Sequence, residues 1–200
     1  MAWATFLSGI FIVGSSLRMN RFVRQRLEQS GKSEYTPRVA LMVPCKDVDP
    51  DFIENMQMLL RQDYPDYEVI FMTVSPEDPC HRHLKDCVAA SQVPARIVFG
   101  GFSRKRCQKL DNMLAGIDAL ADSEHEDPHK PRAEVYIWAD SDARVPRNWL
   151  REMVAPLEDP EVGVSSTYRF YRPLPGRPLS YLLALWTGYQ FCHMHLRKVM

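Results

Sequence analysis

The chain has 200 residues, of which 46% are hydrophobic and 25% are charged, a composition that excludes a disordered chain and suits one globular domain with a sizeable core. Lysine and arginine together number 25, and aspartate and glutamate also number 25. Because there is no net positive charge, the chain lacks the general attraction that draws nucleic acids, and we expect no nucleic-acid partner.

The first predicted element is an apolar segment at the amino terminus. Residues 1–17 carry no charged side chain, whereas residues 18–37 are basic. Positive charge after an apolar segment favours the cytoplasmic side of a membrane, and a signal peptide would carry its charges before that segment. A helix needs at least roughly 17 apolar residues to span hydrocarbon. We therefore predict a membrane anchor at 1–17 and a basic linker at 18–37, with an interfacial or packed helix as the alternative.

The cysteines agree with a domain that faces the cytosol. They are odd in number and form no Cys-x-x-Cys pair, which favours reduced thiols over a zinc or redox site. They are Cys45, Cys80, Cys87, Cys107 and Cys192.

Four short apolar runs rich in β-branched and aromatic residues predict strands, and apolar residues at helical spacing predict helices between them. The strands are expected at Arg38–Val43, Tyr67–Val74, Ala95–Phe99 and Val135–Ala139. The helices are expected from an N-cap at Asp49 to Leu60, at Lys105–Leu120 and from Pro146 to Val154, with a solvated loop at Ala121–Arg132. This alternation predicts an α/β fold with a mostly parallel sheet and helices on both faces.

Ligands of open parallel sheets bind at the carboxyl ends of the strands. The residues that follow the predicted strands are therefore the functional candidates. They are Lys46 and Asp47, then Ser75–Asp78, then Gly100–Lys109, then Asp140–Asp142.

The strongest candidate is the triplet Asp140-Ser141-Asp142, which follows a fully apolar strand. In an extended segment, alternation places both carboxylates on one side. Close carboxylates repel each other unless a cation lies beside them, and Mg²⁺ or Mn²⁺ could fill that place while binding a pyrophosphate. The alternative is a turn or a helix cap before Pro146, which the position after a buried strand disfavours.

A basic segment adds weaker support. Lys109 and Asn112 are three residues apart on a predicted helix, so both could reach one phosphate or ribose. The chain has no Gly-x-x-x-x-Gly-Lys loop and no Gly-x-Gly-x-x-Gly fingerprint, which argues against P-loop enzymes and nicotinamide dehydrogenases. The first strand, in VALMVPCKD, also lacks the glycine-rich signature of sugar nucleotidyltransferases.

Three segments together resemble a known family. They are VALMVPCKDVDPDFIENMQMLLRQDYPDYEVIF, KLDNMLAGIDAL and YIWADSDARVPRNWLREMVAPLEDPEVG. In this order they are similar to family 2 and family 21 glycosyltransferases of GT-A fold, above all to ceramide glucosyltransferases and bacterial hopanoid glycosyltransferases. The resemblance covers about residues 38–172. It implies a nucleotide-sugar donor, usually a UDP-sugar, a divalent metal, and a lipid or other membrane-located acceptor.

The resemblance also implies roles for individual residues. Asp140 matches the second key aspartate of the family, and Lys109 with Asn112 matches its Lys-x-x-Asn segment. Ser75 stands where the first key aspartate is found, with Glu77 or Asp78 as substitutes. The implied donor-binding residues are Pro44, Lys46, Asp47, Ser75, Asp78, Lys109, Asn112 and Asp140, and the implied metal ligands are Asp140 and Asp142.

The family's catalytic base and its Arg-x-x-Arg-Trp motif are not found downstream, and no Asp or Glu follows Glu161. We therefore expect a donor-binding half, truncated before the acceptor half, with the catalytic base unknown and an apolar interfacial segment at 173–200. The expected location is a membrane, with the catalytic domain on its cytoplasmic side. A non-catalytic nucleotide-binding remnant or regulatory protein is the alternative.

Overall fold

The computed structural model describes residues 2–30, 33–126, 132–167, 173 and 175–193. Residues Tyr35–Val154 form one compact unit, and the described parts of Met1–Glu34 and Ala155–Met200 form another. The unit Tyr35–Val154 contains β1 (Val39–Pro44), α2 (Phe52–Leu59), β2 (Tyr67–Thr73), α3 (Pro79–Ala89), β3 (Ala95–Phe99), α4 (Gln108–Glu126), β4 (Val135–Trp138) and α5 (Trp149–Val154).

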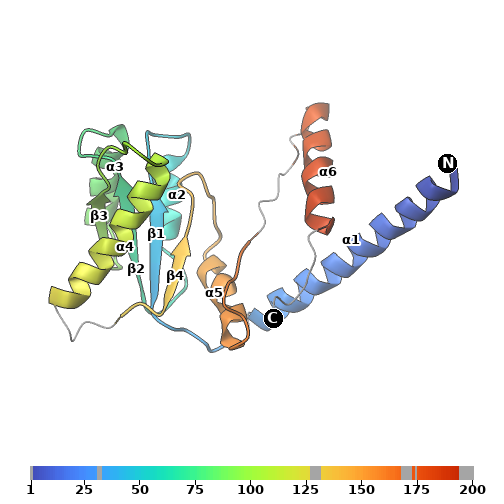
Figure 1. Ribbon diagram of the computed structural model, residues 1–200, viewed down its shortest axis with the longest axis horizontal. Coiled ribbons are helices and arrows are strands. Elements are labelled where there is room, and N and C mark those ends of the chain that lie inside the picture. The colour runs from blue at the N-terminus through green and yellow to red at the C-terminus, as the bar shows by residue number, and fades with distance from the viewer. Residues whose placement is uncertain (1, 31–32, 127–131, 168–172, 174, 194–200) are drawn as a thin grey trace. The chain divides into compact units, whose positions relative to one another are not determined.

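The sheet has four parallel strands in the order β3-β2-β1-β4 (Figure 1). β1 lies in the interior of the sheet, with Val39 aligned to Tyr67 of β2 and Met42 aligned to Trp138 of β4. All seven residues of β2 are buried, as expected for strands covered on both faces. The α/β fold is thus confirmed, and each predicted strand matches an observed one to within one residue at either end.

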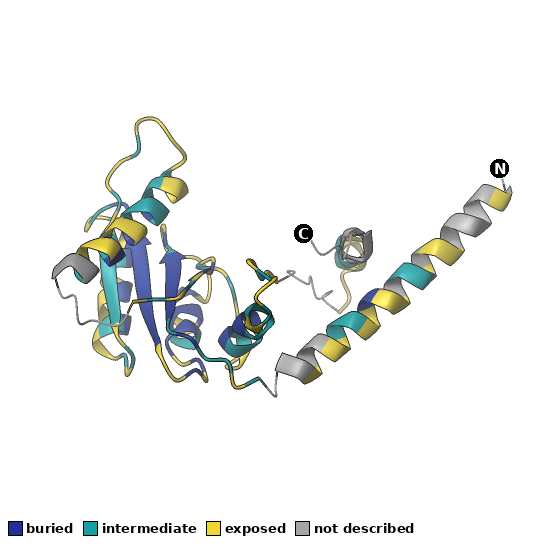
Figure 2. Ribbon diagram, turned by 60° about the horizontal axis from the view of Figure 1, so that its bottom comes forward, coloured by how far each residue is buried: buried dark blue, intermediate teal, exposed yellow. Residues whose placement is uncertain are grey.

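Helices cover both faces of the sheet, and Figure 2 shows the inner strands β1 and β2 as buried, whereas the edge strands β3 and β4 are partly exposed. Alternate residues of each strand point to opposite faces. Val39, Leu41 and Val43 pack with α2, α3 and α5, whereas Ala40 and Met42 pack on the side of Leu120 in α4. Gly116 lets α4 approach the sheet closely, since a Cβ atom there would lie 2.3 Å from Met72 Sδ.

Helix α3 is the element that the sequence analysis did not predict. The dipeptide Asp78-Pro79 was a usable signal, because Asp is a good N-cap and Pro is favoured in the first turn. In the structure, Asp78 is the N-cap, and its side chain accepts a hydrogen bond from Cys80 N at 3.1 Å.

Three predicted helix starts are wrong. α5 begins at Trp149 rather than Pro146, whose carbonyl accepts a bond from Trp149 N at 3.1 Å and closes a turn. The N-cap of α2 is Asp51 rather than Asp49, whose carbonyl instead accepts a bond from Phe52 N at 3.1 Å and closes a turn. α4 begins at Gln108 rather than Lys105, because Ser103 Oγ accepts a bond from Arg106 N and holds a tight loop. α4 also continues to Glu126, into the segment that was expected to be a loop.

In the other unit, α1 runs from Ala2 to Ser30, followed further along the chain by η1 (Ala155–Glu158) and α6 (Pro178–His193). The segment 18–30, expected to be part of a linker, is helical, because it contains good helix formers such as Arg, Leu, Gln and Glu and neither Gly nor Pro. No helix within the described residues is both long enough and apolar enough to cross a membrane.

Candidate functional site

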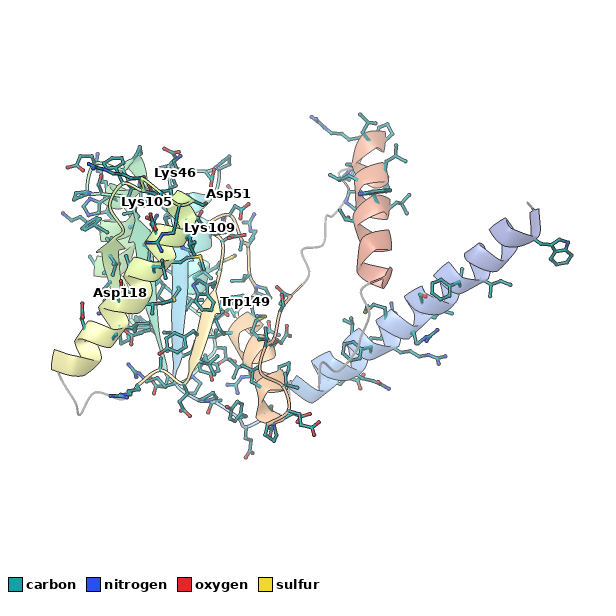
Figure 3. All side chains as sticks on the ribbon, viewed as in Figure 1. Lys46, Asp51, Lys105, Lys109, Asp118 and Trp149 are labelled. Carbon is teal, nitrogen blue, oxygen red and sulfur yellow. The ribbon has the colours of Figure 1, made fainter. Side chains whose placement is uncertain are left out.

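The segments that follow the strands begin side by side at one edge of the sheet. Hydrogen bonds continue past the strand ends, from Cys45 N to Met72 O, from Gly100 N to Thr73 O and from Ala139 N to Met42 O, at 2.7–3.0 Å. Figure 3 shows Lys46, Lys105 and Lys109 at this end of the sheet, with Asp118 farther along α4. These segments therefore lie together at the carboxyl edge of the sheet, where the sequence predicts the ligand site.

The acidic triplet lies in a turn. Ala143 N donates to Asp140 O at 3.0 Å, which closes a four-residue turn, and the side chains of Asp140 and Asp142 are exposed. The expectation of an extended segment is wrong here, so alternation does not explain how the two carboxylates lie. The turn instead places two carboxylates one residue apart on a short loop at the sheet edge.

Lys109 of α4 forms an ion pair with Asp140 across this edge. Their side chains are 54% and 47% exposed, so water screens the pair and it contributes about 0–1 kcal/mol to stability. The pair brings together two residues that lie 31 positions apart and that were predicted independently. The ammonium group of Lys109 stands where a cation beside Asp140 was expected.

Asn112 does not lie beside Lys109 at the surface. Its side chain is 2% exposed and accepts a bond from Gln108 Nε2 at 2.9 Å, and Gln108 also donates to Gly101 O at 2.7 Å. A Cβ atom at Gly100 would lie 2.4 Å from Asn112 Oδ1. Asn112 therefore supports the loop that begins at Gly100, and a shared phosphate contact with Lys109 stays a prediction.

Asp47 and Asp78 join the loops that follow β1 and β2. Asp47 adopts a left-handed conformation with φ at 55°, which Asp tolerates better than most residues, and its N–H donates to Asp78 Oδ1 at 3.1 Å. Burial raises the pKa of Asp78, but hydrogen bonds from Cys80, Asp47 and Thr73 outweigh this effect and hold the pKa below its usual value.

We expect Asp78→Ala to destabilise the chain at neutral pH by about 0.5–2 kcal/mol, because α3 loses its cap and Asp47 N loses its acceptor. Since the pKa of Asp78 is lower in the folded state than in the unfolded state, its contribution is present above the unfolded pKa. It is lost as the pH falls through the folded pKa. Urea unfolding of both proteins over a pH series measures this, and a constant difference down to the lowest pH would contradict it.

The remaining predicted donor-binding residues, Pro44, Lys46 and Ser75, lie at the same edge. Pro44 is the last residue of β1, aligned with Met72, and Lys46 is exposed. Ser75 serves its own turn, since its hydroxyl accepts a bond from Glu77 N at 3.3 Å and its carbonyl accepts one from Asp78 N at 3.2 Å.

Comparison with known proteins now adds to this geometry. A sequence model of the family described as glycosyl transferase family 21 matches residues 1–176. The chain belongs to this family. The fold of this family 21 chain is also similar to the solved structure of the mannosyltransferase PcManGT from Pyrobaculum calidifontis in complex with GDP-Man and Mn²⁺, with a TM-score of 0.51 and 22% sequence identity. The match covers 77% of this chain and 44% of the mannosyltransferase, so the likeness shows the shared GT-A fold over less than half of that enzyme.

The family 21 chain offers a hard cation few ligands of its own. No group of three His, Cys, Asp or Glu side chains within the described residues could hold a metal ion. Asp140 and Asp142 provide two carboxylates, and Mg²⁺ commonly binds one or two carboxylates together with water and the phosphates of a substrate. The acidic turn therefore fits a cation that arrives with a diphosphate better than one held by protein alone.

The sequence analysis missed two buried amides that hold this edge together. Asn55 of α2 donates through Nδ2 to Ser141 O at 3.3 Å, and Gln62 donates to Pro146 O at 3.1 Å. The signal was available for Asn55, because position 55 lies on the apolar face of α2 with Phe52 and Leu59. A polar residue in such a stripe is a candidate for a buried contact.

Proposed function

We propose that this family 21 chain is the donor-binding part of a glycosyltransferase, which binds a nucleotide-sugar at the carboxyl edge of its sheet. The observation that carries the proposal is the acidic turn at Asp140–Asp142 with Lys109 paired to Asp140. A nucleotide-sugar with its cation carries a negative diphosphate and a positive metal ion. The carboxylates at this edge can bind the metal ion, and the ammonium group beside them can bind the diphosphate. The donor that we propose is a UDP-sugar, on the strength of the sequence resemblance.

The acidic turn would hold Mg²⁺ or Mn²⁺ through the carboxylates of Asp140 and Asp142. When bound, such a cation neutralises charge that develops on the leaving diphosphate. Lys109 stands beside Asp140 on a long, exposed side chain, so its ammonium group can turn from the carboxylate to a phosphate oxygen. Lys46 and Arg104 are further exposed cations in the segments that follow β1 and β3.

We propose a lipid acceptor and attachment of the chain to a membrane surface, with the donor-binding unit on the cytoplasmic side. Support comes from apolar side chains that α1 and α6 leave exposed, including Trp3 and Phe11 in α1 and Leu182, Leu185 and Trp186 in α6. Burying exposed apolar side chains in the interface of a bilayer is favourable. The basic residues of α1 support the cytoplasmic side.

A non-catalytic nucleotide-binding protein is the second candidate. None of the residues that the resemblance assigns to the carboxyl edge of the sheet is a catalytic base. A positioned base contributes roughly 100-fold to 10,000-fold to such a transfer. Release of UDP from UDP-glucose above the buffer rate in the presence of ceramide-containing vesicles would exclude this second candidate, since a pure binding protein releases none.

The donor site is tested by removing the metal. We expect the wild-type chain to bind UDP in the presence of Mn²⁺ and to bind it at least about 100-fold more weakly in EDTA, because two carboxylates alone repel a diphosphate. Isothermal titration calorimetry measures both affinities. GDP, titrated in parallel, reports base preference. Equal UDP affinity with and without Mn²⁺ would remove the metal from the proposal, and no binding of either nucleotide would remove the donor site.

A further inference from the structure

Asn55 connects α2 to the middle of the acidic turn. Its side chain is only 3% exposed, and its amide nitrogen donates to the carbonyl of Ser141, 86 positions away in the sequence. Ser141 stands between the two carboxylate-bearing residues of the turn. A bond to its carbonyl therefore restrains the backbone from which both Asp140 and Asp142 project.

The other end of the Asn55 amide is unsatisfied. Asn55 Oδ1 is buried and has no hydrogen-bond partner within the part of the chain that the structure describes. Burying a carbonyl oxygen without a donor is unfavourable, and an apolar side chain would avoid this cost in a helix face that also buries Phe52, Met56 and Leu59. An apolar residue at position 55 could not form the hydrogen bond to Ser141, so this bond is what the amide contributes.

Two ion pairs connect the start of α2 to Arg144, the residue directly after the acidic turn. Arg144 pairs with Glu54, and its other guanidinium nitrogen lies 3.8 Å from Asp51. All three side chains are about half exposed, so these pairs contribute little to stability. Asn55 is the buried contact between α2 and the turn, and the ion pairs flank it.

We propose that Asn55 is a positioning residue for the acidic turn, which sets the direction of the Asp140 and Asp142 carboxylates toward a divalent cation and the diphosphate that it carries. This inference rests on the proposed function. It assigns to α2 a role at the donor site, although α2 supplies none of the predicted donor-binding residues. Partners that hold metal ligands in place typically change metal affinity or activity by about 10–100-fold when they are replaced.

Gln62 provides a matched comparison. It is also a buried amide, 7% exposed, and it joins the end of α2 to the segment after the turn. Its Nε2 donates to Pro146 O at 3.1 Å, and its Oε1 accepts a bond from Leu150 N at 2.9 Å. Gln62 thus supports the fold as strongly as Asn55 does but contacts no residue of the turn in these bonds. A purely structural role for Asn55 predicts that both residues behave alike.

The experiment compares Asn55→Ala with Gln62→Ala and the wild-type chain. Calorimetry measures UDP affinity with Mn²⁺, and thermal unfolding measures stability. We expect Asn55→Ala to bind UDP with Mn²⁺ at least about 10-fold more weakly than wild type, whereas Gln62→Ala loses at least as much stability and stays within about 2-fold of the wild-type affinity. Equal losses of affinity in both variants, or none in Asn55→Ala, would overturn the proposal while leaving the donor site in place.

Hydrogen exchange gives a second measurement that needs no ligand. The amide of Ala143 bonds to Asp140 O and reports whether the turn stays closed. We expect this amide to exchange at least about 10-fold faster in Asn55→Ala than in wild type and to be unchanged in Gln62→Ala. Unchanged exchange in Asn55→Ala overturns the positioning role. If the alanine variant does not fold, Asn55→Ser removes the same contact. A wild-type chain that binds no nucleotide overturns both proposals.

Discussion

Replacing both Asp140 and Asp142 by alanine is expected to weaken Mn²⁺-dependent UDP binding at least about 100-fold, which corresponds to about 2.8 kcal/mol. The two carboxylates are the ligands that the acidic turn can offer, and no group of three potential ligands is found in the described parts of the chain to replace them. Because both side chains are exposed and lie in a turn, stability should change by no more than about 0.5 kcal/mol. Calorimetry with UDP and Mn²⁺ measures the affinity, and thermal unfolding measures the stability.

Asp118→Asn is the matched control for this variant. Asp118 is an exposed carboxylate on α4, away from the sheet edge (Figure 3), so its loss changes the charge of the chain without changing the turn. We expect wild-type UDP affinity in this control. The metal-site proposal fails if the double variant and the control bind UDP with the same affinity in Mn²⁺.

Replacing Gly100 by alanine is expected to destabilise the chain by about 1–3 kcal/mol. The added Cβ atom would lie 2.8 Å from Asn112 Cα and 2.4 Å from Asn112 Oδ1. Part of this clash is with the backbone of α4, so rotation of one side chain cannot relieve it. α4 or the loop from Gly100 must shift, and Lys109 lies on the same first turns of that helix. UDP affinity should therefore fall together with stability.

Gly163→Ala is the control for this prediction. A Cβ atom at Gly163 meets nothing within 4 Å, and the residue does not have a positive φ angle. We expect its unfolding free energy to stay within about 0.5 kcal/mol of wild type. Urea unfolding of the two variants measures the difference. Equal stability of Gly100→Ala and wild type would show that Asn112 does not pack against the loop as the structure describes.

The strands and the sheet edge could be predicted because their signals are local and strong. Uninterrupted apolar runs such as Val39–Val43 suit strands buried on both faces, and a chain of strand and helix in alternation has few other ways to fold. α3 was missed because its helical face is short, with three buried residues, Cys80, Leu84 and Cys87. Its cap, Asp78-Pro79, was the clearer signal.

The candidate site was predicted in part. Asp140 and Lys109 were singled out separately, and the structure pairs them across the sheet edge. The conformation of Asp140–Ala143 could not be predicted, because alternation holds only while the backbone stays extended. Asn112 was predicted to reach a ligand together with Lys109, and the structure buries its side chain against Gly100.

The amino-acid sequence by itself determined the four strands, the family, and the position of the acidic triplet after an apolar strand, since these depend on residue patterns within short segments. That strand, β4, was expected to be buried, but Tyr136 and Trp138 are exposed because β4 lies at the edge of the sheet. The tertiary structure alone decided which distant residues meet: Asn55 with Ser141, Asp47 with Asp78, and Asn112 with Gly100. Such contacts depend on how helices pack on the sheet, to within a fraction of an ångström. The packing of the whole core sets those positions, and no local pattern of residues records them.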